Sequence, residues 1–133
     1  MADANIGLQI ADEYIIEEKI GKGGISTVYR ASQFRLKRPV AIKLLHDHLV
    51  NYHFFKRFCR EAKVACTLNH AHIITVFNFG QTKEGKLYMV MEFVDGEPLS
   101  AVLRQGSRNI DGMRALDLMA QAVGAMAHAH ARR

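Results

Sequence analysis

The sequence predicts an α+β domain in which five strands and three helices follow one another in the order β-β-β-α-β-β-α-α. Two observations lead to this prediction. Short apolar runs bounded by glycine-rich or charged turns have the composition of strands, and two longer segments repeat apolar residues at helical spacing. With 133 residues, the chain is one domain or part of a larger one.

The five predicted strands fall into two groups along the chain. Tyr14–Ile20 and Ser26–Phe34 flank a cluster of glycines that is typical of a hairpin turn. Pro39–Leu45 is the third strand, and its proline stands at the start, where a strand tolerates one. Ile74–Gly80 and Lys86–Val94 form the second group and are separated by a short polar turn.

The three predicted helices are Val50–Leu68, Pro98–Arg104 and Asp111–Arg133. In the first of them, a rotation of about 100° per residue places Glu61 near the middle of an apolar stripe. That stripe consists of Phe54, Phe58, Ala65 and Leu68. A carboxylate isolated in an apolar face is unfavourable, so we expect Glu61 to have a cationic partner.

The third strand offers such a partner. With a period of two, Ala41 and Lys43 share one face of the strand, and the other face carries Val40, Ile42 and Leu44. A single inward lysine and a single inward glutamate explain each other as an ion pair between Lys43 and Glu61. The alternative, in which both side chains lie at the margin of the domain and reach water, stays open at this point.

Charge and cysteine content limit the possible functions. The net charge is +5, but the basic residues are scattered and no RNA-binding signature or zinc-finger spacing accompanies them. We therefore expect a solvated surface and no nucleic-acid partner.

Cys59 and Cys66 lie in one predicted helix without a Cys-x-x-Cys pattern, which favours a reducing, cytoplasmic location. We expect no signal peptide, and no run approaches the roughly 20 apolar residues that a membrane segment needs.

Histidines recur in pairs, but their spacing does not favour a metal site. The sequence contains three His-x-His pairs: His46 with His48, His70 with His72, and His128 with His130. Residues two apart on a helix point away from each other, and the pairs at the ends of elements lack a nearby set of cysteines or carboxylates. We predict no metal ligands, and we expect His130 to pack within the apolar stripe of the last helix.

The glycine cluster lies in the stretch IGKGGISTVYRA, from Ile20 to Ala31. Glycines in such a turn allow the backbone to approach a bound group, and backbone N–H groups there can point at phosphate oxygens. A hairpin that uses glycine only for its shape is the alternative. A strand follows this turn and no helix does, so neither a Rossmann turn nor a Walker loop fits.

Four stretches together resemble the eukaryotic-like serine/threonine protein kinases of bacteria. IGKGGISTVYRA resembles the glycine-rich loop, and VAIK at 40–43 resembles the motif that carries the kinase lysine. Residues 55–74 resemble the αC helix with the following strand, and residues 87–99 resemble the fifth strand and the hinge. The resemblance implies a five-stranded antiparallel sheet with the αC helix, followed by the αD and αE helices of a C-lobe.

The same resemblance divides the chain and assigns its site. It implies a lead-in at 1–13 and an incomplete kinase domain at 14–133, with an N-lobe at about 14–94, a hinge at about 92–97 and the start of a C-lobe at about 98–133. The implied ATP-binding residues are Ile20, Gly21, Lys22, Gly23, Gly24, Ser26, Val28, Ala41, Lys43, Met91, Glu92 and Val94. Lys43 would contact the α- and β-phosphates and pair with Glu61.

The remaining roles follow in the same way. Val28 and Ala41 would pack on the adenine, Met91 matches the gatekeeper, and the backbone of Glu92 and Val94 matches the hinge. Two positions depart from the family pattern. Ser26 stands in place of the third glycine of the loop and should stiffen its tip slightly. Pro98 stands where many kinases place a polar residue on the ribose, so we expect no ribose contact there.

The function implied is transfer of the ATP γ-phosphate to serine or threonine of a protein substrate. No His-Arg-Asp or Asp-Phe-Gly motif occurs in the chain, so we expect Mg²⁺ only in the complete kinase and expect this chain to be inactive alone. A non-catalytic N-lobe module that binds a nucleotide or a partner is the alternative. The largely apolar helix at 111–133 is expected to promote self-association.

Overall fold

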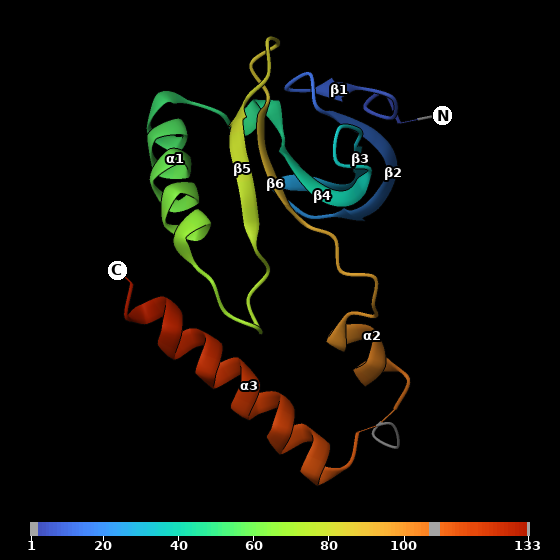
Figure 1. Cartoon of the computed structure of the whole chain (residues 1–133), viewed down its shortest axis with the longest axis vertical. Helices are drawn as coiled ribbons and strands as arrows, with labels where there is room; N and C mark the ends of the chain where they lie inside the picture. Colours follow the sequence, from blue (N-terminus) through green and yellow to red (C-terminus); the bar gives the residue numbers. More distant parts are fainter. Residues whose placement is uncertain (1–2, 107–109, 133) are drawn as a thin grey trace. The chain divides into compact units, whose positions relative to one another are not determined.

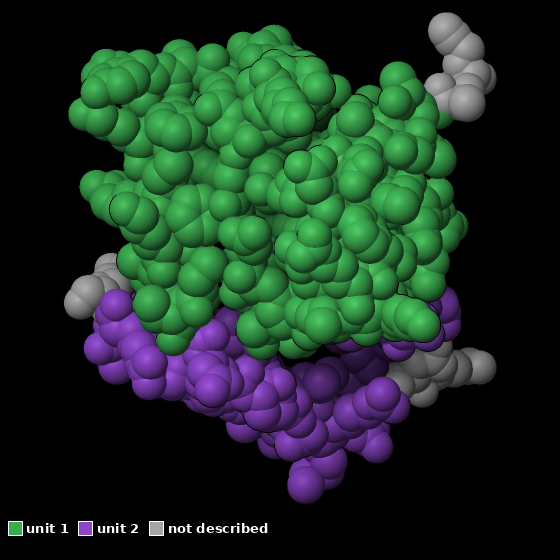
Figure 2. Space-filling model, turned by 45° about the horizontal axis from the view of Figure 1, so that its top comes forward, with its two compact units in different colours: residues 1–67, 75–93 green, residues 68–74, 94–133 purple. Residues whose placement is uncertain are grey.

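The computed structural model describes residues 3–106 and 110–132, and these form two compact units. Unit 1 comprises Met1–Thr67 and Thr75–Phe93. Unit 2 comprises Leu68–Ile74 and Val94–Arg133, and the two units are coloured separately in Figure 2. The segment at 68–74 therefore belongs with the last helices, although it lies between two elements of unit 1.

Unit 1 contains a six-stranded sheet in which every pair of neighbouring strands is antiparallel, in the order β1-β2-β3-β4-β6-β5 (Figure 1). The strands are β1 (Gln9–Ile10), β2 (Tyr14–Lys22), β3 (Ser26–Gln33), β4 (Arg38–Leu45), β5 (Val76–Gln81) and β6 (Leu87–Glu92). The five predicted strands are confirmed, with ends that differ by one or two residues. The predicted number of strands is wrong, because β1 is a sixth.

Strand β1 is missed because two residues are too short to show a period. Between β1 and β2 the chain turns through Ala11 and Asp12, both with φ of 52°, and the amide of Glu13 donates to the Ile10 carbonyl over 3.1 Å. Ile10 is fully buried and belongs to the core of the sheet. Part of the segment at 1–13 is therefore integral to unit 1 and is more than a lead-in.

Polar contacts hold the residues before β1 on the same sheet. The hydroxyl of Tyr29, on β3, donates to the Asp3 carboxylate over 3.1 Å and accepts from the Asn5 side chain over 2.9 Å. Lys19 lies 3.6 Å from the same carboxylate, and Lys86 donates to the Asn5 side chain over 2.9 Å. The backbone hydrogen bond from Asn5, together with the contacts to Tyr29 and Lys19, lowers the pKa of Asp3 below its usual range. These contacts join four separate segments of unit 1.

The alternation predicted for β4 divides the sheet into two faces. Val40, Ile42 and Leu44 are buried in the core cluster. The opposite face carries Lys43, which pairs in register with Val28 of β3 and with Met89 of β6. Ala41 and Met91 are also opposite each other in register, and this places them on the same side as Lys43. We call this side the Lys43 face, and it consists of Val28, Ala41, Lys43, Met89 and Met91.

Helix α1 (Tyr52–Thr67) packs against β5, beside which it lies in Figure 1, and it confirms the predicted helix at Val50–Leu68. A short 3₁₀ turn, η1 (Asp47–Leu49), precedes it. The Asn51 side chain accepts a hydrogen bond from the Phe54 amide over 2.9 Å and so stabilises the first turn of the helix. The rings of Phe58 and Phe79 meet edge to face with their centroids 6.1 Å apart, which anchors the helix on the sheet.

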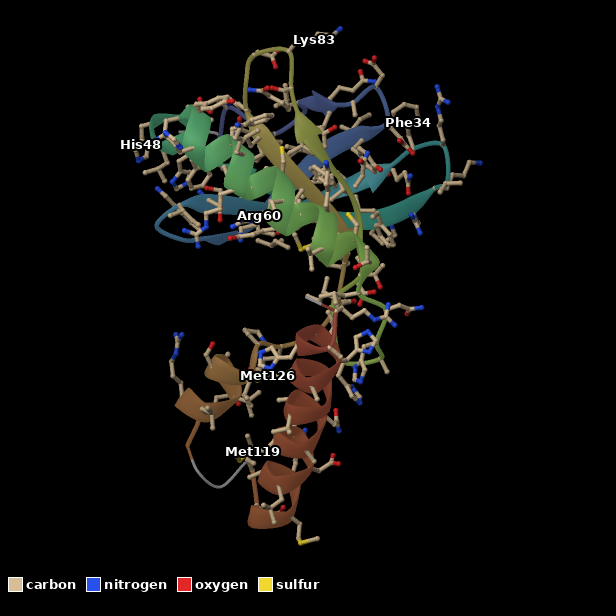
Figure 3. The ribbon with its side chains drawn as sticks, turned by 90° about the vertical axis from the view of Figure 1, so that its left-hand side faces the viewer. Phe34, His48, Arg60, Lys83, Met119 and Met126 are labelled. Atoms are coloured by element: carbon tan, nitrogen blue, oxygen red, sulfur yellow. The ribbon has the colours of Figure 1, made fainter. Side chains whose placement is uncertain are left out.

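Unit 2 contains helices α2 (Leu99–Arg104) and α3 (Gly112–His130), close to the bounds predicted from the sequence. Asp111 caps α3, because its side chain accepts from the Arg114 amide over 2.7 Å. A stripe of large apolar side chains along α3 is exposed. It consists of Met113, Leu116, Met119, Val123 and Met126, of which Met119 and Met126 are labelled in Figure 3. In the part of the chain that the structure describes, no helix has the length and apolar character needed to cross a bilayer.

The histidine predicted to pack on α3 does not do so. His130 is exposed, whereas His128 is half-buried with its ring centroid 5.2 Å from that of His70. Burial, with smaller effects from Arg132 and His70, lowers the pKa of His128. The apolar stripe and His130 therefore lie on the exposed surface, and His128 makes the ring contact within unit 2.

Candidate functional site

Lys43 lies half-buried on the Lys43 face, and its ammonium group takes no part in the ion pairs or side-chain hydrogen bonds found among residues 3–106 and 110–132. The period of two in β4 points this side chain away from the core. An ammonium group without a counter-ion among these residues can pair with an anionic ligand.

A cavity of about 320 Å³ lies between the Lys43 face and helix α1. Its lining residues are Ile25, Lys43, Leu45, Phe54, Arg57, Phe58, Glu61 and Met89. The structure thus brings Lys43 and Glu61 to the walls of one cavity, as the ion-pair hypothesis requires. The aromatic rings on α1 and the Met89 side chain give the cavity an apolar lining around these charged groups.

The expected ion pair between Lys43 and Glu61 is not formed. The carboxylate of Glu61 accepts instead from Arg57 Nε over 2.8 Å, one helical turn earlier. This hydrogen bond, the largest effect, lowers the pKa of Glu61 and raises that of Arg57. The side chain of Glu61 is 59% exposed, so the premise that it is enclosed by apolar residues is also wrong. Residues four apart on a helix are neighbours, and Arg57 reaches Glu61 without any movement of α1.

The glycine-rich turn joins β2 to β3. The Gly23 amide donates to the Ser26 carbonyl over 2.8 Å, and Ser26 is buried where β3 begins. Neither Gly21, Gly23 nor Gly24 has a positive φ, so this turn does not need glycine for its backbone conformation. A Cβ at Gly24 would meet no heavy atom within 4 Å. Open space beside an unhindered backbone is what close approach of a ligand requires.

The other predicted site residues fall into three places. Val28, Ala41 and Met91 share the Lys43 face. Ile20 and Lys22 are exposed at the end of β2. Glu92 pairs with Val40 and its amide donates to the Thr75 carbonyl over 2.9 Å in unit 1, whereas the exposed Val94 belongs to unit 2. Apart from Val94, the predicted site residues therefore lie in unit 1.

One residue at this site gave no usable signal in the sequence. His46 occurs there only as half of a His-x-His pair, yet in the structure its ring contacts the glycine-rich turn. Within the described ranges, no group of three or more histidine, cysteine, aspartate or glutamate side chains is arranged to hold a metal ion.

An antiparallel sheet, a glycine-rich turn, and a strand lysine that shares a cavity with a helix glutamate are together typical of the N-lobe of a protein kinase domain. The chain matches the protein kinase domain family over residues 14–133 and belongs to that family. It is 38% identical over 129 residues to the serine/threonine-protein kinase pkn3 of Myxococcus xanthus. It is also 38% identical over 126 residues to PrkC of Bacillus subtilis and 36% identical over 131 residues to PknA of Mycobacterium tuberculosis.

Solved structures give the same result. This chain superposes on a crystal structure of the Mycobacterium tuberculosis PknI kinase domain with a TM-score of 0.82 at 27% identity. The superposition covers 98% of this chain and 52% of the PknI chain. The matches cover 96%, 94% and 95% of this chain but only 23%, 19% and 30% of pkn3, PrkC and PknA. The chain thus corresponds to under a third of the length of these curated relatives and to about half of a kinase domain.

Proposed function

We propose that the Lys43 face and the glycine-rich turn bind ATP, as the nucleotide-binding part of a serine/threonine protein kinase that phosphorylates a protein substrate. The observation that carries this proposal is the unpaired ammonium group of Lys43 beside the cavity that it shares with Glu61. The named serine/threonine kinases among its relatives support the reaction and the type of substrate.

The residues present fit the nucleotide. Lys43 offers a cation for the α- and β-phosphates, and the backbone at Gly23 and Gly24 is open enough to cover them. Val28 and Ala41 supply an apolar surface for the adenine, with Met91 opposite Ala41 in register. Within unit 1, the backbone of Glu92 would hold the adenine edge.

Glu61 would change partner when the nucleotide is held for transfer. Its pair with Arg57 is exposed and lies within one helix, and pairs of this kind contribute little to stability. Release from Arg57 would allow the carboxylate to approach Lys43 across the cavity and fix the position of the ammonium group. Lys43 and Glu61 would then orient the phosphates together, and Mg²⁺ bound with the nucleotide would supply charge neutralisation in the complete kinase.

A nucleotide titration of the chain followed by NMR tests the proposal. Lys43→Met should weaken ATP binding by at least about tenfold, because it removes a charge-assisted contact to phosphate. Lys63→Met is the matched control, since Lys63 is exposed on α1 and does not line the cavity, and it should leave the affinity unchanged. Equal affinity of the two variants, or no binding by the wild-type chain, would contradict the proposal.

The non-catalytic alternative shares the binding step and lacks the transfer of phosphate. A longer protein that contains this chain should phosphorylate serine or threonine in a protein, and Lys43→Met should abolish that activity. ATP binding without phosphate transfer in that longer protein would favour a nucleotide-binding module. We also propose a cytoplasmic location, in keeping with the two free cysteines.

A further inference from the structure

His46 contacts the glycine-rich turn from outside it through three polar groups. Its amide donates to the Ile25 carbonyl over 3.0 Å. Its ring nitrogens lie 3.3 Å (Nδ1) from the Gly24 carbonyl oxygen and 3.1 Å (Nε2) from Thr27 Oγ1. These contacts join the residue that follows β4 to both sides of the tip of the turn.

The chemistry of the partners fixes the roles of the two ring nitrogens. The Gly24 carbonyl can only accept a hydrogen bond, so Nδ1 carries a proton and donates to it. In the neutral ring Nε2 then accepts from the Thr27 hydroxyl. In the charged ring Nε2 donates, and the hydroxyl turns to accept. The bridge from Gly24 to Thr27 is therefore satisfied in both protonation states of His46.

The tip of the turn has little else to hold it. The Gly23 amide binds the Ser26 carbonyl within the turn, Gly24 has open space around it, and Ile25 is 51% exposed. Within the part of the chain that the structure describes, His46 is the side chain that hydrogen-bonds residues 23–25. Its ring thus limits the movement of the tip.

The ring approaches the turn from the side away from the cavity that Lys43 lines. Thr27 and Leu44 alternate with Val28 and Lys43 along their strands, so they lie on the opposite face of the sheet. His46 lines a separate pocket of about 480 Å³ with these two residues. It can hold the tip without occupying space on the Lys43 face.

We propose that His46 is a positioning residue for the nucleotide phosphates: through its bridge from Gly24 to Thr27, it holds the glycine-rich turn in the conformation that covers them. This inference rests on the proposed ATP binding. A turn that is already ordered avoids the loss of conformational entropy on binding, and apparent affinity falls in proportion to the population of the competent conformation.

The inference predicts a selective effect on phosphate-bearing ligands. His46→Leu introduces an apolar side chain of comparable bulk and removes both ring hydrogen bonds. It should weaken ATP binding about fivefold. Adenosine lacks the phosphates that the turn covers, so its affinity should be unchanged. Hydrogen exchange without nucleotide should become faster at the amides of residues 23 and 46, which donate to the Ser26 and Ile25 carbonyls at the turn.

Two further variants provide controls. His53→Leu makes the same change at an exposed histidine on α1 that lines neither the Lys43 cavity nor the His46 pocket, and it should alter neither ligand affinity nor exchange at the turn. Thr27→Val removes only the Nε2 partner and is close in shape. It should give a smaller loss of ATP affinity, about two- to threefold, and it serves as the test if His46→Leu does not fold.

The outcomes separate the two proposals. Wild-type binding of ATP, with a loss of ATP but not adenosine affinity in His46→Leu, supports the inference. Equal losses for both ligands, or unchanged exchange at the turn, overturn it and leave the proposed function standing. Absence of ATP binding by the wild-type chain overturns the proposed function and this inference with it.

Discussion

Gly80 is the glycine at which a side chain would be least tolerated. It lies opposite Tyr88 in the β5–β6 pairing, and a Cβ added there would lie 2.8 Å from Tyr88 Oη, 3.0 Å from Cζ and 3.3 Å from Cε1. Tyr88 is buried in the core cluster, and burial raises the pKa of its hydroxyl. The ring therefore has little room to retreat from a new methyl group.

Two opposing effects decide the stability of Gly80→Ala. Replacing glycine by alanine in a strand should stabilise by roughly 0.5–1 kcal/mol, because the unfolded chain loses freedom. Overpacking against a buried ring costs about 1–3 kcal/mol. The contact at 2.8 Å makes the second effect the larger, so we expect a net loss of about 1–2 kcal/mol. For a domain of roughly 60–100 residues this lowers Tm by about 5–15 °C, measured by thermal unfolding followed by circular dichroism.

A double-mutant cycle identifies the cause of this loss. In a Tyr88→Leu background the ring is absent, and Gly80→Ala should become neutral or stabilising. Gly24→Ala is the control substitution in the same unit, because no atom lies within 4 Å of its added Cβ, and it should change Tm little. A wild-type Tm in Gly80→Ala, or the same loss with and without the Tyr88 ring, would show that the clash is not the cause.

Three other properties can be tested directly. Ala11 and Asp12 both have φ of 52°, a left-handed conformation that asparagine and glycine adopt at lower cost. The double variant Ala11→Asn, Asp12→Gly should therefore raise the stability of unit 1 by about 1 kcal/mol in chemical denaturation. Unchanged stability would contradict this. Because the pKa of Asp3 is lowered, its carboxylate stabilises the fold above its unfolded pKa of about 3.8, and this stabilisation is lost as pH falls through the lower folded pKa. Amide exchange near residue 5 should accelerate in that acidic range, and Asp3→Asn should abolish this pH dependence. Leu116→Glu with Val123→Glu should reduce self-association of the chain in light scattering, and a monomeric wild-type chain would disprove the role of the exposed stripe.

The apolar period of the strands and the order of the motifs predicted most elements of the sheet and the face on which Lys43 lies. The alternation in β4 separated Lys43 from the face that carries Val40, Ile42 and Leu44, and the structure confirms that only the latter face belongs to the core cluster. Strand and helix ends are correct to within one or two residues for most elements, because glycine, proline and capping residues mark them. The family resemblance is confirmed by the match over residues 14–133.

The hydrogen-bond and ion-pair partners of Glu61 and His46 could not be predicted from the sequence. Helical rotation gives the direction of Glu61 but does not decide between Lys43 on a strand and Arg57 one turn away, since that depends on how closely α1 approaches the sheet. The contacts of His46 depend on a turn that lies about 20 residues away in the chain, and no local pattern records them. The roles of the individual ATP-binding residues remain predictions.

The short strand β1 covers the outer edge of β2, so a chain that begins after β1 would expose that edge. The family match begins at residue 14, but β1 pairs with β2, and the Gly7 amide donates to the Ile16 carbonyl over 2.8 Å. A chain cut at Tyr14 would leave the outer edge of β2 without its hydrogen-bond partners and would remove Ile10 from the core. An unpaired strand edge is a template for pairing with another molecule. Such a shortened chain should therefore aggregate more readily than one that keeps residues 3–13, even though both contain the whole matched domain.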